Sequence, residues 1–384
     1  MAPELQRVNG TLVPTKKRTI LSVAYPLTEV GPDSVGGSEQ ILTMLDRALT
    51  DAGHQSIVIA AEGSRVGGTL IPSPQTTASL SDAVREWGRG VHEQLIRSAL
   101  AKYKVDLVHM HSLDFHCYMP PEQVKVLATL HLPPDWYPEA IFRMQRPQFK
   151  MNCVSFSQFQ HCPESPHLVA PISNGVDLDK LKVRASRKQD FALCLGRICP
   201  EKGFHFALDA ARQAEMPLLL AGQVFPYQSH IDYFNNLILP RLDDSRRFVG
   251  PASFARKKLL LAQAKCLIIP STVAETSSLV AMEALACGTP VIAFRSGALP
   301  EIVRHGLTGF IVDSVEEMSA ALRQVDSLDL RNCRREATNR FSAETMTAKY
   351  LDLYDTLIEG EAKEWVPHAA SSATAATGQW LTAT

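Results

Sequence analysis

The sequence lacks the features that mark several large classes of protein. No window approaches the roughly 18 uninterrupted apolar residues that a membrane-spanning helix needs. The eight cysteines are scattered and form no Cys-x-x-Cys pair, which argues against a zinc knuckle or a thioredoxin-type redox pair. The formal net charge is only −1, so bulk electrostatics would not hold this chain to nucleic acid or lipid. We therefore expect no nucleic-acid partner.

Signals for export or membrane attachment are also scarce. The first 17 residues, MAPELQRVNGTLVPTKK, are polar and contain no apolar core of signal-peptide length. Cys194 and Cys266 lie inside apolar runs, which is typical of buried free thiols in a cytosolic protein. We expect a cytoplasmic location. Residues 141–150, IFRMQRPQFK, are the one candidate for a basic apolar membrane face, and a solvated surface segment explains them equally well.

What is present is the composition of a globular enzyme. The 384 residues are 45% hydrophobic and 21% charged, and they suffice for two α/β domains. Apolar strands alternate with amphipathic helices, a pattern typical of parallel sheets that are covered on both faces. We predict two Rossmann-like, doubly wound domains that face each other across a cleft. The expected parts are a flexible leader (1–17), an N-terminal acceptor-side domain (18–172), a linker (173–190), a C-terminal nucleotide-sugar domain (191–341), a helix that crosses back to the first domain (342–360) and a flexible tail (361–384).

The pattern also predicts the individual elements. In the first domain, strands are expected within 18–26, 55–61, 105–111, 124–131 and 151–157, and helices over 38–53 and 79–103. Ser38 is placed to cap the first helix and Gly53 to end it. In the second domain, strands are expected within 191–196, 217–222, 246–250, 265–270, 289–294 and 309–313, and helices over 204–214, 231–239, 254–264 and 277–288.

Two glycines follow the first predicted strand. Gly36 and Gly37 allow a ligand to approach the backbone, and the helix that starts at Ser38 offers free N–H groups to an anion. Residues 31–38 nearly spell a P-loop, but Gly37 stands where that motif has its lysine, which excludes a P-loop nucleotidase. A plain glycine-rich turn is the structural alternative.

The segment LGRICPEKG follows the first strand of the second domain. Arg197 and Lys202 would lie at the open end of a parallel sheet, where two cations can neutralise a diphosphate and stabilise a departing nucleoside diphosphate. A solvated surface pair is the alternative.

A third motif lies in PSTVAETSSLVAMEALACGTPVIA. Glu275 precedes a helix and Glu283 lies eight positions later inside it, and Ser277 or Ser278 is placed to cap that helix. The N–H groups of Ser278 and Leu279 would point to where a phosphate could bind. Glu283 would face the cleft or solvent, where a carboxylate can accept hydrogen bonds from sugar or ribose hydroxyls.

These motifs, taken in order, resemble the retaining glycosyltransferases of family 4, which have the GT-B fold. The resemblance covers about residues 19–357 and rests on VGGSEQ, DLVHMH, TLH, SNGVD, GRICPEKG, FVGP, the E-x7-E segment and PVIAFRSGALPEIVRHGLTGFIV. One departure is clear. This chain has Thr276-Ser277-Ser278 where the family usually has a glycine and an aromatic residue, although serine can still present its N–H to a phosphate.

The resemblance implies a role for each candidate residue. Gly36 and Gly37 would approach the donor diphosphate and Arg197 and Lys202 would bind it. Glu275 would hold hydroxyls of the transferred sugar and Glu283 the ribose. The remaining implied positions are Gly250 and Pro251 beside the nucleobase and His131 against the donor sugar.

Without the resemblance, His131 reads as a packed histidine at a strand end. His109 is expected to be structural. His111 and Asp114 are the candidates for the acceptor side.

The resemblance further implies retention of the anomeric configuration. We expect a hexose to pass from a nucleotide diphosphate sugar, UDP-linked by default and GDP-mannose next, to a hydroxyl of a small-molecule, glycan or lipid-linked acceptor. The one D-x-D triplet, Asp177-Leu178-Asp179, lies in the expected linker, and we expect no metal and no other cofactor. The alternatives are an epimerase or phosphorylase on the same fold and a non-catalytic sugar-nucleotide-binding subunit. No G-x-G-x-x-G follows either first strand, which disfavours a nicotinamide dehydrogenase.

Overall fold

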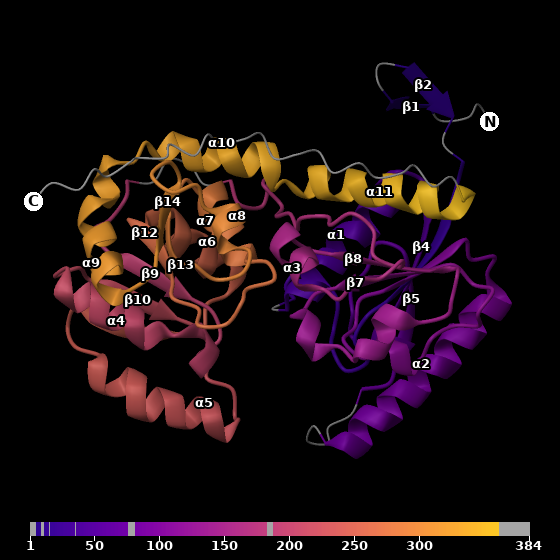
Figure 1. Ribbon diagram of the computed structural model, residues 1–384, viewed down its shortest axis with the longest axis horizontal. Helices are drawn as coiled ribbons and strands as arrows, with labels where there is room; N and C mark the ends of the chain where they lie inside the picture. The colour runs from indigo at the N-terminus through magenta and orange to yellow at the C-terminus, as the bar shows by residue number, and fades with distance from the viewer. Residues whose placement is uncertain are drawn as a thin grey trace, which may run out of the picture.

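The chain folds into two halves, each built around a parallel six-stranded sheet (Figure 1). The computed structural model describes residues 5–8, 11–14, 16–34, 36–75, 81–182 and 187–360. The predicted α/β class with two Rossmann-like halves is confirmed. The tail expected over 361–384 lies outside the described residues. Within the expected leader, β1 (Leu5–Val8) and β2 (Thr11–Pro14) pair as a small antiparallel hairpin.

The first sheet has the strand order β5-β4-β3-β6-β7-β8. Its strands are β3 (Thr19–Val23), β4 (Gln55–Ala61), β5 (Thr69–Ser73), β6 (Leu107–Met110), β7 (Val126–Leu130) and β8 (Phe149–Cys153). The accompanying helices are α1 (Gly37–Asp51), α2 (Asp82–Lys102), α3 (Phe156–His161) and the short turns η1 (Phe115–Cys117), η2 (Pro134–Trp136) and η3 (Glu139–Arg143). The sequence did not predict β5, a partly exposed edge strand that contains a proline.

The second sheet has the strand order β11-β10-β9-β12-β13-β14. Its strands are β9 (Ala192–Leu195), β10 (Leu218–Ala221), β11 (Arg246–Gly250), β12 (Cys266–Ile269), β13 (Val291–Phe294) and β14 (Gly309–Val312). Its helices are α4 (Phe204–Gln213), α5 (Gln228–Tyr233), α6 (Phe254–Gln263), α7 (Leu279–Ala286), α8 (Leu299–Ile302), α9 (Val315–Gln324) and α10 (Leu330–Arg340), with the shorter η4 (Pro200–Lys202), η5 (Phe234–Ile238), η6 (Leu239–Arg241) and η7 (Val325–Ser327).

The helix end predicted at Gly53 and the N-cap position predicted at Ser278 are confirmed, whereas the N-cap predicted at Ser38 is wrong. Gly53 and Gly288 have φ of +79° and +70°, the left-handed conformation that ends a helix. Ser38, however, lies inside α1, whose N-cap is Gly36, and its hydroxyl donates to Glu39 instead. Ser278 is the N-cap of α7, but its side chain makes no capping hydrogen bond.

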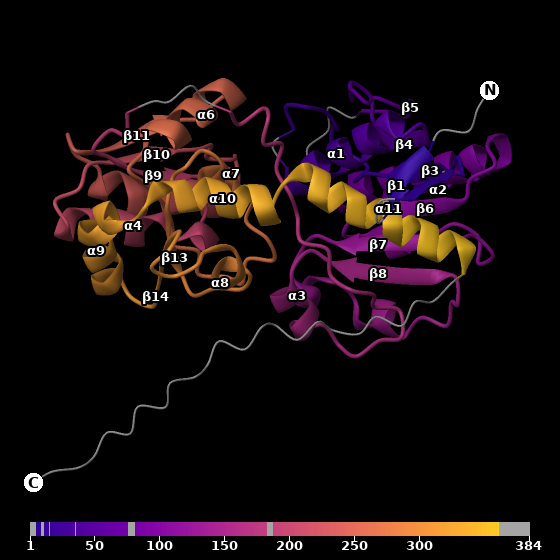
Figure 2. The ribbon, with the colours of Figure 1, turned by 90° about the horizontal axis from the view of Figure 1, so that it is seen from above.

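Helix α11 (Ala343–Glu359) crosses from the second half to the first, as predicted (Figures 1 and 2). Tyr350 and Tyr354 are buried against the first half. Arg18 Nε donates to Asp355 at 2.7 Å, and Lys125 Nζ donates to the carbonyl of Leu357 at 3.1 Å near the helix C-terminus. Cations are favourable at that end of a helix dipole, so these contacts fasten α11 to the first sheet.

The polypeptide passes between the halves at two points that lie side by side. The N–H of Val176 donates to the carbonyl of Phe341 at 2.8 Å, and the N–H of Ala343 donates to the carbonyl of Val176 at 3.0 Å. A Cβ atom on Gly175 would lie 2.6 Å from the carbonyl oxygen of Ser342, so glycine is required for this close approach.

Residues 141–150 do not form an exposed apolar face. Ile141 and Phe142 are buried in the core, and Arg146 donates to the carbonyls of Pro120 and Pro121. The sequence suggested a membrane-binding face here because it shows the apolar residues but not that they point inward. No helix in the described part of the chain is long and apolar enough to cross a membrane.

Candidate active site between the two halves

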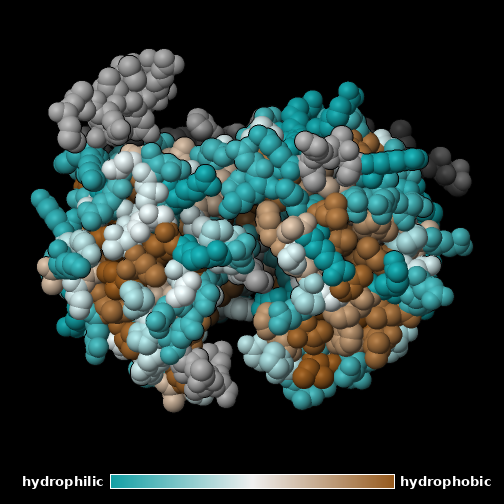
Figure 3. Space-filling view, turned by 180° about the vertical axis from the view of Figure 1, so that it is seen from behind, coloured by the Kyte–Doolittle hydropathy of each residue, from teal (hydrophilic) through white to brown (hydrophobic). Residues whose placement is uncertain are grey.

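The molecule is hollowed between its two halves (Figure 3). The start of α1 meets the start of α7 there: a Cβ atom on Gly37 would lie 3.6 Å from Leu279 Cδ1. Leu279 is partly buried and packs against apolar clusters of both halves. Thr276 Oγ1 donates to the carbonyl of His131 at 2.9 Å. Two helix N-termini and the end of β7 therefore converge at this point.

Lys202 and Glu275 form an ion pair on the second-half side of the hollow. Lys202 Nζ lies 2.5 Å from Glu275 Oε1, and Ser271 Oγ donates to the same oxygen. The backbone is held as well, because the N–H of Ala298 donates to the carbonyl of Glu275 at 2.7 Å. The Glu275 side chain is 11% exposed. Its carboxylate is therefore oriented and still reachable, as a group that binds hydroxyls must be.

The loop that carries Lys202 depends on Gly203. Its φ is +62°, and a Cβ atom there would lie 2.2 Å from the carbonyl oxygen of Pro270. Any side chain would push the loop away from the end of β12. Arg197, at the start of the same loop, is exposed. Both cations thus lie beyond the carboxyl end of β9, as the sequence predicts.

Glu283 lies inside the protein and pairs with a lysine that the sequence analysis missed. It is 5% exposed, which excludes solvent and leaves the cleft of the two expected orientations, and Lys257 Nζ lies 2.5 Å from its Oε1. Burial raises the pKa of the Glu283 carboxyl, and the Lys257 ammonium opposes that rise. One signal for Lys257 was available: it lies four positions before the buried Leu261 on α6, hence on the inward face of that helix.

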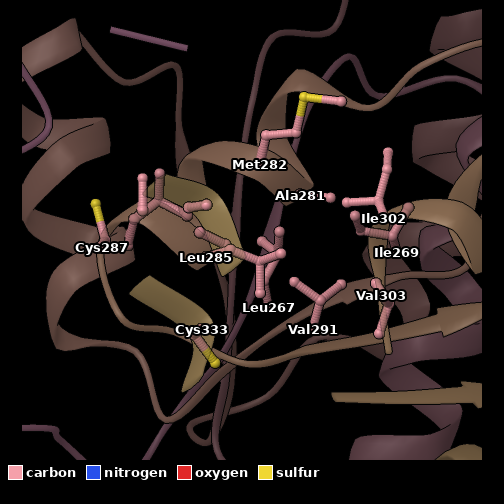
Figure 4. Packing of buried hydrophobic residues seen from close by; sticks show 14 of the residues in the cluster. Leu267, Ile269, Ala281, Met282, Leu285, Cys287, Val291, Ile302, Val303 and Cys333 are labelled. Carbon is pink, nitrogen blue, oxygen red and sulfur yellow. The ribbon is translucent and has the colours of Figure 1, made fainter. Parts of the chain in front are cut away.

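Helix α7 presents its first turn to the hollow because its other side is fixed in the core. Figure 4 shows Leu285 of α7 packed toward Leu267 of β12 and Val291 of β13. The first N–H groups of an α-helix have no partner within the helix, and Ser278 caps none of them with its hydroxyl. Ser278 and Leu279 therefore offer backbone N–H groups and the positive end of the helix dipole to an anion.

Three histidines form a chain at the first-half side. His111 Nδ1 lies 3.1 Å from His131 Nε2, and the rings of His109 and His111 have centroids 3.9 Å apart. His109 is fully buried between Tyr354 and Thr129, which agrees with its expected structural role. Although His131 as a residue keeps some exposure, burial lowers the pKa of its imidazole to about 4, and burial lowers the pKa of His109 and His111 well below the usual range. All three are neutral near pH 7.

Asp114 belongs to a separate network. Its carboxylate accepts hydrogen bonds from Arg89 Nε at 2.9 Å, Tyr118 at 2.9 Å and Ser112. Burial raises its pKa, but the hydrogen bonds from Ser112, Arg89 and Tyr118 outweigh that effect, so the pKa lies below the usual range. The side chain is 10% exposed. Asp114 is thus a fixed anion on the loop that follows His111.

The remaining predicted residues, Gly36, Gly250 and Pro251, lie at the start of α1 and at the end of β11. A Cβ atom on Gly36 would lie 1.9 Å from the carboxylate of Glu39, so the α1 N-terminus already has an acidic neighbour. Gly250 has φ +73° with no atom within 4 Å of a built Cβ, and Pro251 is exposed. Gly250 ends the edge strand β11, which lies two strands from β9, and Pro251 follows it.

Comparison with known proteins identifies the kind of enzyme that carries this arrangement. Residues 177–342 match the family model Glycosyl transferases group 1. An uncharacterized glycosyltransferase of Methanocaldococcus jannaschii is 33% identical over 37% of this chain, and the match spans 38% of that protein's length. A glycogen synthase of Mycobacterium tuberculosis is 26% identical over 89% of this chain and 95% of its own length.

Solved structures agree with the fold. Sucrose-phosphate synthase from Thermosynechococcus elongatus superimposes with a TM-score of 0.71 at 19% identity, over 89% of this chain and all of that one. An Anabaena protein in complex with UDP-glucose gives a TM-score of 0.67 at 17% identity, over 88% of this chain and 99% of that one. The chain has the two-lobed fold of these proteins, and residues 177–342 in its second half are similar to the group 1 glycosyltransferase model.

Proposed function

We propose that this chain is a retaining glycosyltransferase that moves a hexose from a nucleotide diphosphate sugar to a hydroxyl acceptor. The observation that carries the proposal is the convergence of the Lys202–Glu275 ion pair with the open N-terminus of α7, opposite His131. This places cations and free N–H groups beside a carboxylate that can hold sugar hydroxyls.

In this proposal the donor diphosphate lies between the two helix N-termini. Arg197, Lys202 and the N–H groups of Ser278 and Leu279 bind it from the second half, while Gly36 and Gly37 let the first half approach. These groups are fixed before the substrate binds, so they stabilise the charge that develops on the leaving phosphate without reorganisation.

The proposed chemistry takes place on one face of the sugar. The bond from the anomeric carbon to the leaving phosphate breaks as the acceptor oxygen bonds to the same carbon, and that phosphate takes the hydroxyl proton. Both carboxylates of the E-x7-E segment are paired with lysines, which suits roles in binding rather than attack. Neutral His131 can exchange hydrogen bonds with the sugar without adding a charge. Glu275 would hold the sugar hydroxyls and Glu283 the ribose.

The donor and acceptor are proposed by chemical class. A UDP-sugar is the first candidate, supported by the structural likeness to the Anabaena protein that binds UDP-glucose, and GDP-mannose is the second. Gly250 and Pro251 would border the base. His111 and Asp114 would line the acceptor side, and the acceptor would be a small molecule, a glycan or a lipid-linked sugar. We propose that the reaction needs no metal ion.

Thermal unfolding in the presence of UDP, GDP, ADP and dTDP, with and without EDTA, tests the cleft. A ligand that binds only the folded state raises the free energy of unfolding, and with it the melting temperature. At a ligand concentration of 100 times the dissociation constant, the gain in unfolding free energy is about 2.7 kcal/mol. We expect one nucleotide to raise it and the rise to survive EDTA. If no nucleotide raised the melting temperature, the result would indicate that this protein does not use nucleotide sugars as donors.

Product analysis with the matching sugar nucleotide then separates the related activities. We expect a glycoside of the α or β configuration that the donor had. A changed sugar nucleotide would indicate an epimerase, a requirement for inorganic phosphate would indicate a phosphorylase, and tight nucleotide binding with no donor turnover would indicate a binding subunit.

A further inference from the structure

Three metal-ligating side chains meet at the outer side of the loop that carries Lys202. One ligand atom each from Cys199, Glu201 and His230 lies within 4.8 Å of the other two. Cys199 and Glu201 stand on either side of Pro200 in the η4 turn, and His230 lies in α5, after β10. Cys199 is 2% exposed and His230 9%, whereas Glu201 is exposed. Two of the three ligand residues are thus buried, and the third is in contact with solvent.

His230 supplies a second, independent observation. Its Nδ1 atom is buried and has no hydrogen-bond partner among the described residues. Burying an unpaired polar nitrogen costs free energy, and the fold itself offers nothing that offsets the cost here. The ring is held in place by Tyr227 and Phe225, with centroids 5.1 and 6.4 Å away. Packing therefore sets the orientation of the His230 ring, although its Nδ1 atom has no hydrogen-bond partner among the described residues.

The chemistry of the three ligands selects the ion. Thiolate, imidazole and carboxylate are zinc ligands with bonds of about 2.0–2.3 Å, which put tetrahedral ligand atoms roughly 3.3–3.8 Å apart. The three ligand atoms lie up to 4.8 Å apart, so they must move about an ångström closer together to bind one ion. The exposed Glu201 side chain can make such a movement. The hard cations Mg²⁺ and Ca²⁺ prefer oxygen ligands and would gain little from Cys199 and His230.

We propose that Cys199, Glu201 and His230 form a Zn²⁺ site with an open fourth position. On binding, the Cys199 thiol loses its proton to solvent as the Sγ–zinc bond forms. The sequence analysis expected no metal because it considered only the short motifs Cys-x-x-Cys and D-x-D, and here the third ligand comes from another element, 29 positions after Glu201.

The site would stiffen the donor loop. Lys202 follows Glu201 directly, and the carbonyl of Glu201 accepts a hydrogen bond from the N–H of Thr272 at 3.0 Å, on the loop that leads to Glu275. An ion that ties η4 to α5 would hold the loop on which Lys202 lies. Pro200, between Cys199 and Glu201, and Ser229, next to His230, line part of a surface hollow. The ion has no part in the proposed transfer chemistry.

Cobalt substitution in the full-length protein tests the site without an activity assay. The protein is stripped with a chelator under reducing conditions, dialysed and titrated with Co²⁺. We expect one equivalent to give thiolate charge-transfer absorption in the near ultraviolet, together with the visible bands of a tetrahedral or five-coordinate ion, and Zn²⁺ to displace it.

The variants locate the ligands. C199S should abolish the charge-transfer band, and H230Q and E201Q should weaken Co²⁺ binding by more than about tenfold, the lower range for disturbing a metal site. Matched controls are C117S and H161Q, whose side chains are exposed elsewhere, and both should bind as the unaltered protein does. E201Q alters only an exposed side chain, so it keeps the test decisive if another variant fails to fold.

Two results would overturn the proposal. One is no thiolate band in the unaltered protein. The other is a band that survives C199S, for example on Cys153 and Cys162, whose Sγ atoms lie 3.4 Å apart. Since the readout is ion binding, failure would leave the proposed transferase activity untouched, and the nucleotide-induced rise in melting temperature with EDTA tests that activity separately.

Discussion

The chain of His109, His111 and His131 should make the stability of this protein sensitive to acid. Burial lowers the pKa of all three side chains, that of His131 to about 4. A histidine with a lowered folded-state pKa takes up its proton more readily when unfolded, so its stabilising contribution is complete above about pH 6.5 and is lost as the pH falls toward 4. For His131 alone this loss is about 2 kcal/mol at pH 5.

The free energy of unfolding in urea at pH 7.5 and pH 5 measures this effect. His131→Gln should reduce the difference between the two pH values by about 2 kcal/mol, whereas His161→Gln, on an exposed histidine, should not change it. An undiminished pH dependence in His131→Gln would mean that His131 titrates normally in the folded protein.

The Lys202–Glu275 pair leads to a second prediction at the residue scale. Lys202→Ala should lower turnover of the donor by roughly 100-fold or more, since one preorganised group that stabilises a developing oxyanion contributes about that much. The melting temperature should fall as well, because Lys202 is only 26% exposed and its removal leaves the Glu275 carboxylate, 11% exposed, without its ion-pair partner. The comparison is Lys180→Ala, which alters an exposed lysine paired with Asp177. Turnover of Lys202→Ala within a few-fold of normal would place the diphosphate elsewhere.

Sequence alone could identify the charged residues of this site but not their partners. Glu275 and Glu283 stand out by their spacing around a predicted helix, and Arg197 and Lys202 by their place after a strand. The pairing of Lys202 with Glu275, and of Lys257 with Glu283, joins segments that only the folded sheet brings together. Hence the burial of Glu283 could not be foreseen.

At the scale of elements, the junction between η4 and α4 depends on one glycine. Gly203→Ala would force a side chain into a left-handed backbone conformation and within 2.2 Å of the Pro270 carbonyl. We expect it to lower the free energy of unfolding by at least about 1–2 kcal/mol and to reduce donor turnover by displacing Lys202.

Gly90→Ala is the matched control for that change. Gly90 lies in α2, is exposed and has no atom within 4 Å of a built Cβ, so alanine there should raise stability by about 0.5–1 kcal/mol. Chemical denaturation of both variants measures the two changes in the free energy of unfolding, which should have opposite signs. Equal effects would show that the Gly203 loop tolerates a side chain by moving.

Elements with strong apolar patterns were predictable and polar ones were not. Strand β4 was predicted residue for residue, because six of its seven residues, all after Gln55, are apolar or small. Helix α10, LRNCRREATNR, was missed, because only Cys333, Glu336 and Ala337 of its residues are buried. The capping of α1 by Ser38 failed for another reason: Gly36, Gly37 and Ser38 are consecutive candidates for the N-cap, and the structure places it at Gly36.

At the scale of the whole molecule, we predict that the two halves can move about a hinge. Both crossings of the chain lie side by side at Val176 and at residues 341–343. Away from that hinge, Thr276 donates to the carbonyl of His131 and the N–H groups of Phe156 and Ser157 donate to Glu301. These three hydrogen bonds contribute about 1 kcal/mol each. Losing all three is enough to shift the protein from a mostly closed to a mostly open population.

The double variant Thr276→Val with Glu301→Ala should therefore open the hollow between the halves. We expect a larger radius of gyration in solution scattering without ligand, and a donor KM raised by roughly tenfold, because part of the binding free energy must then close the protein. Excess nucleotide should restore the compact form, since a ligand held by both halves favours the closed state. Glu316→Ala, on an exposed face of α9, is the control and should leave both quantities unchanged. If the double variant stayed compact with a normal KM, the apolar contact of Leu279 with the first half would be what holds the halves together, and Leu279→Ala would be the change that separates them.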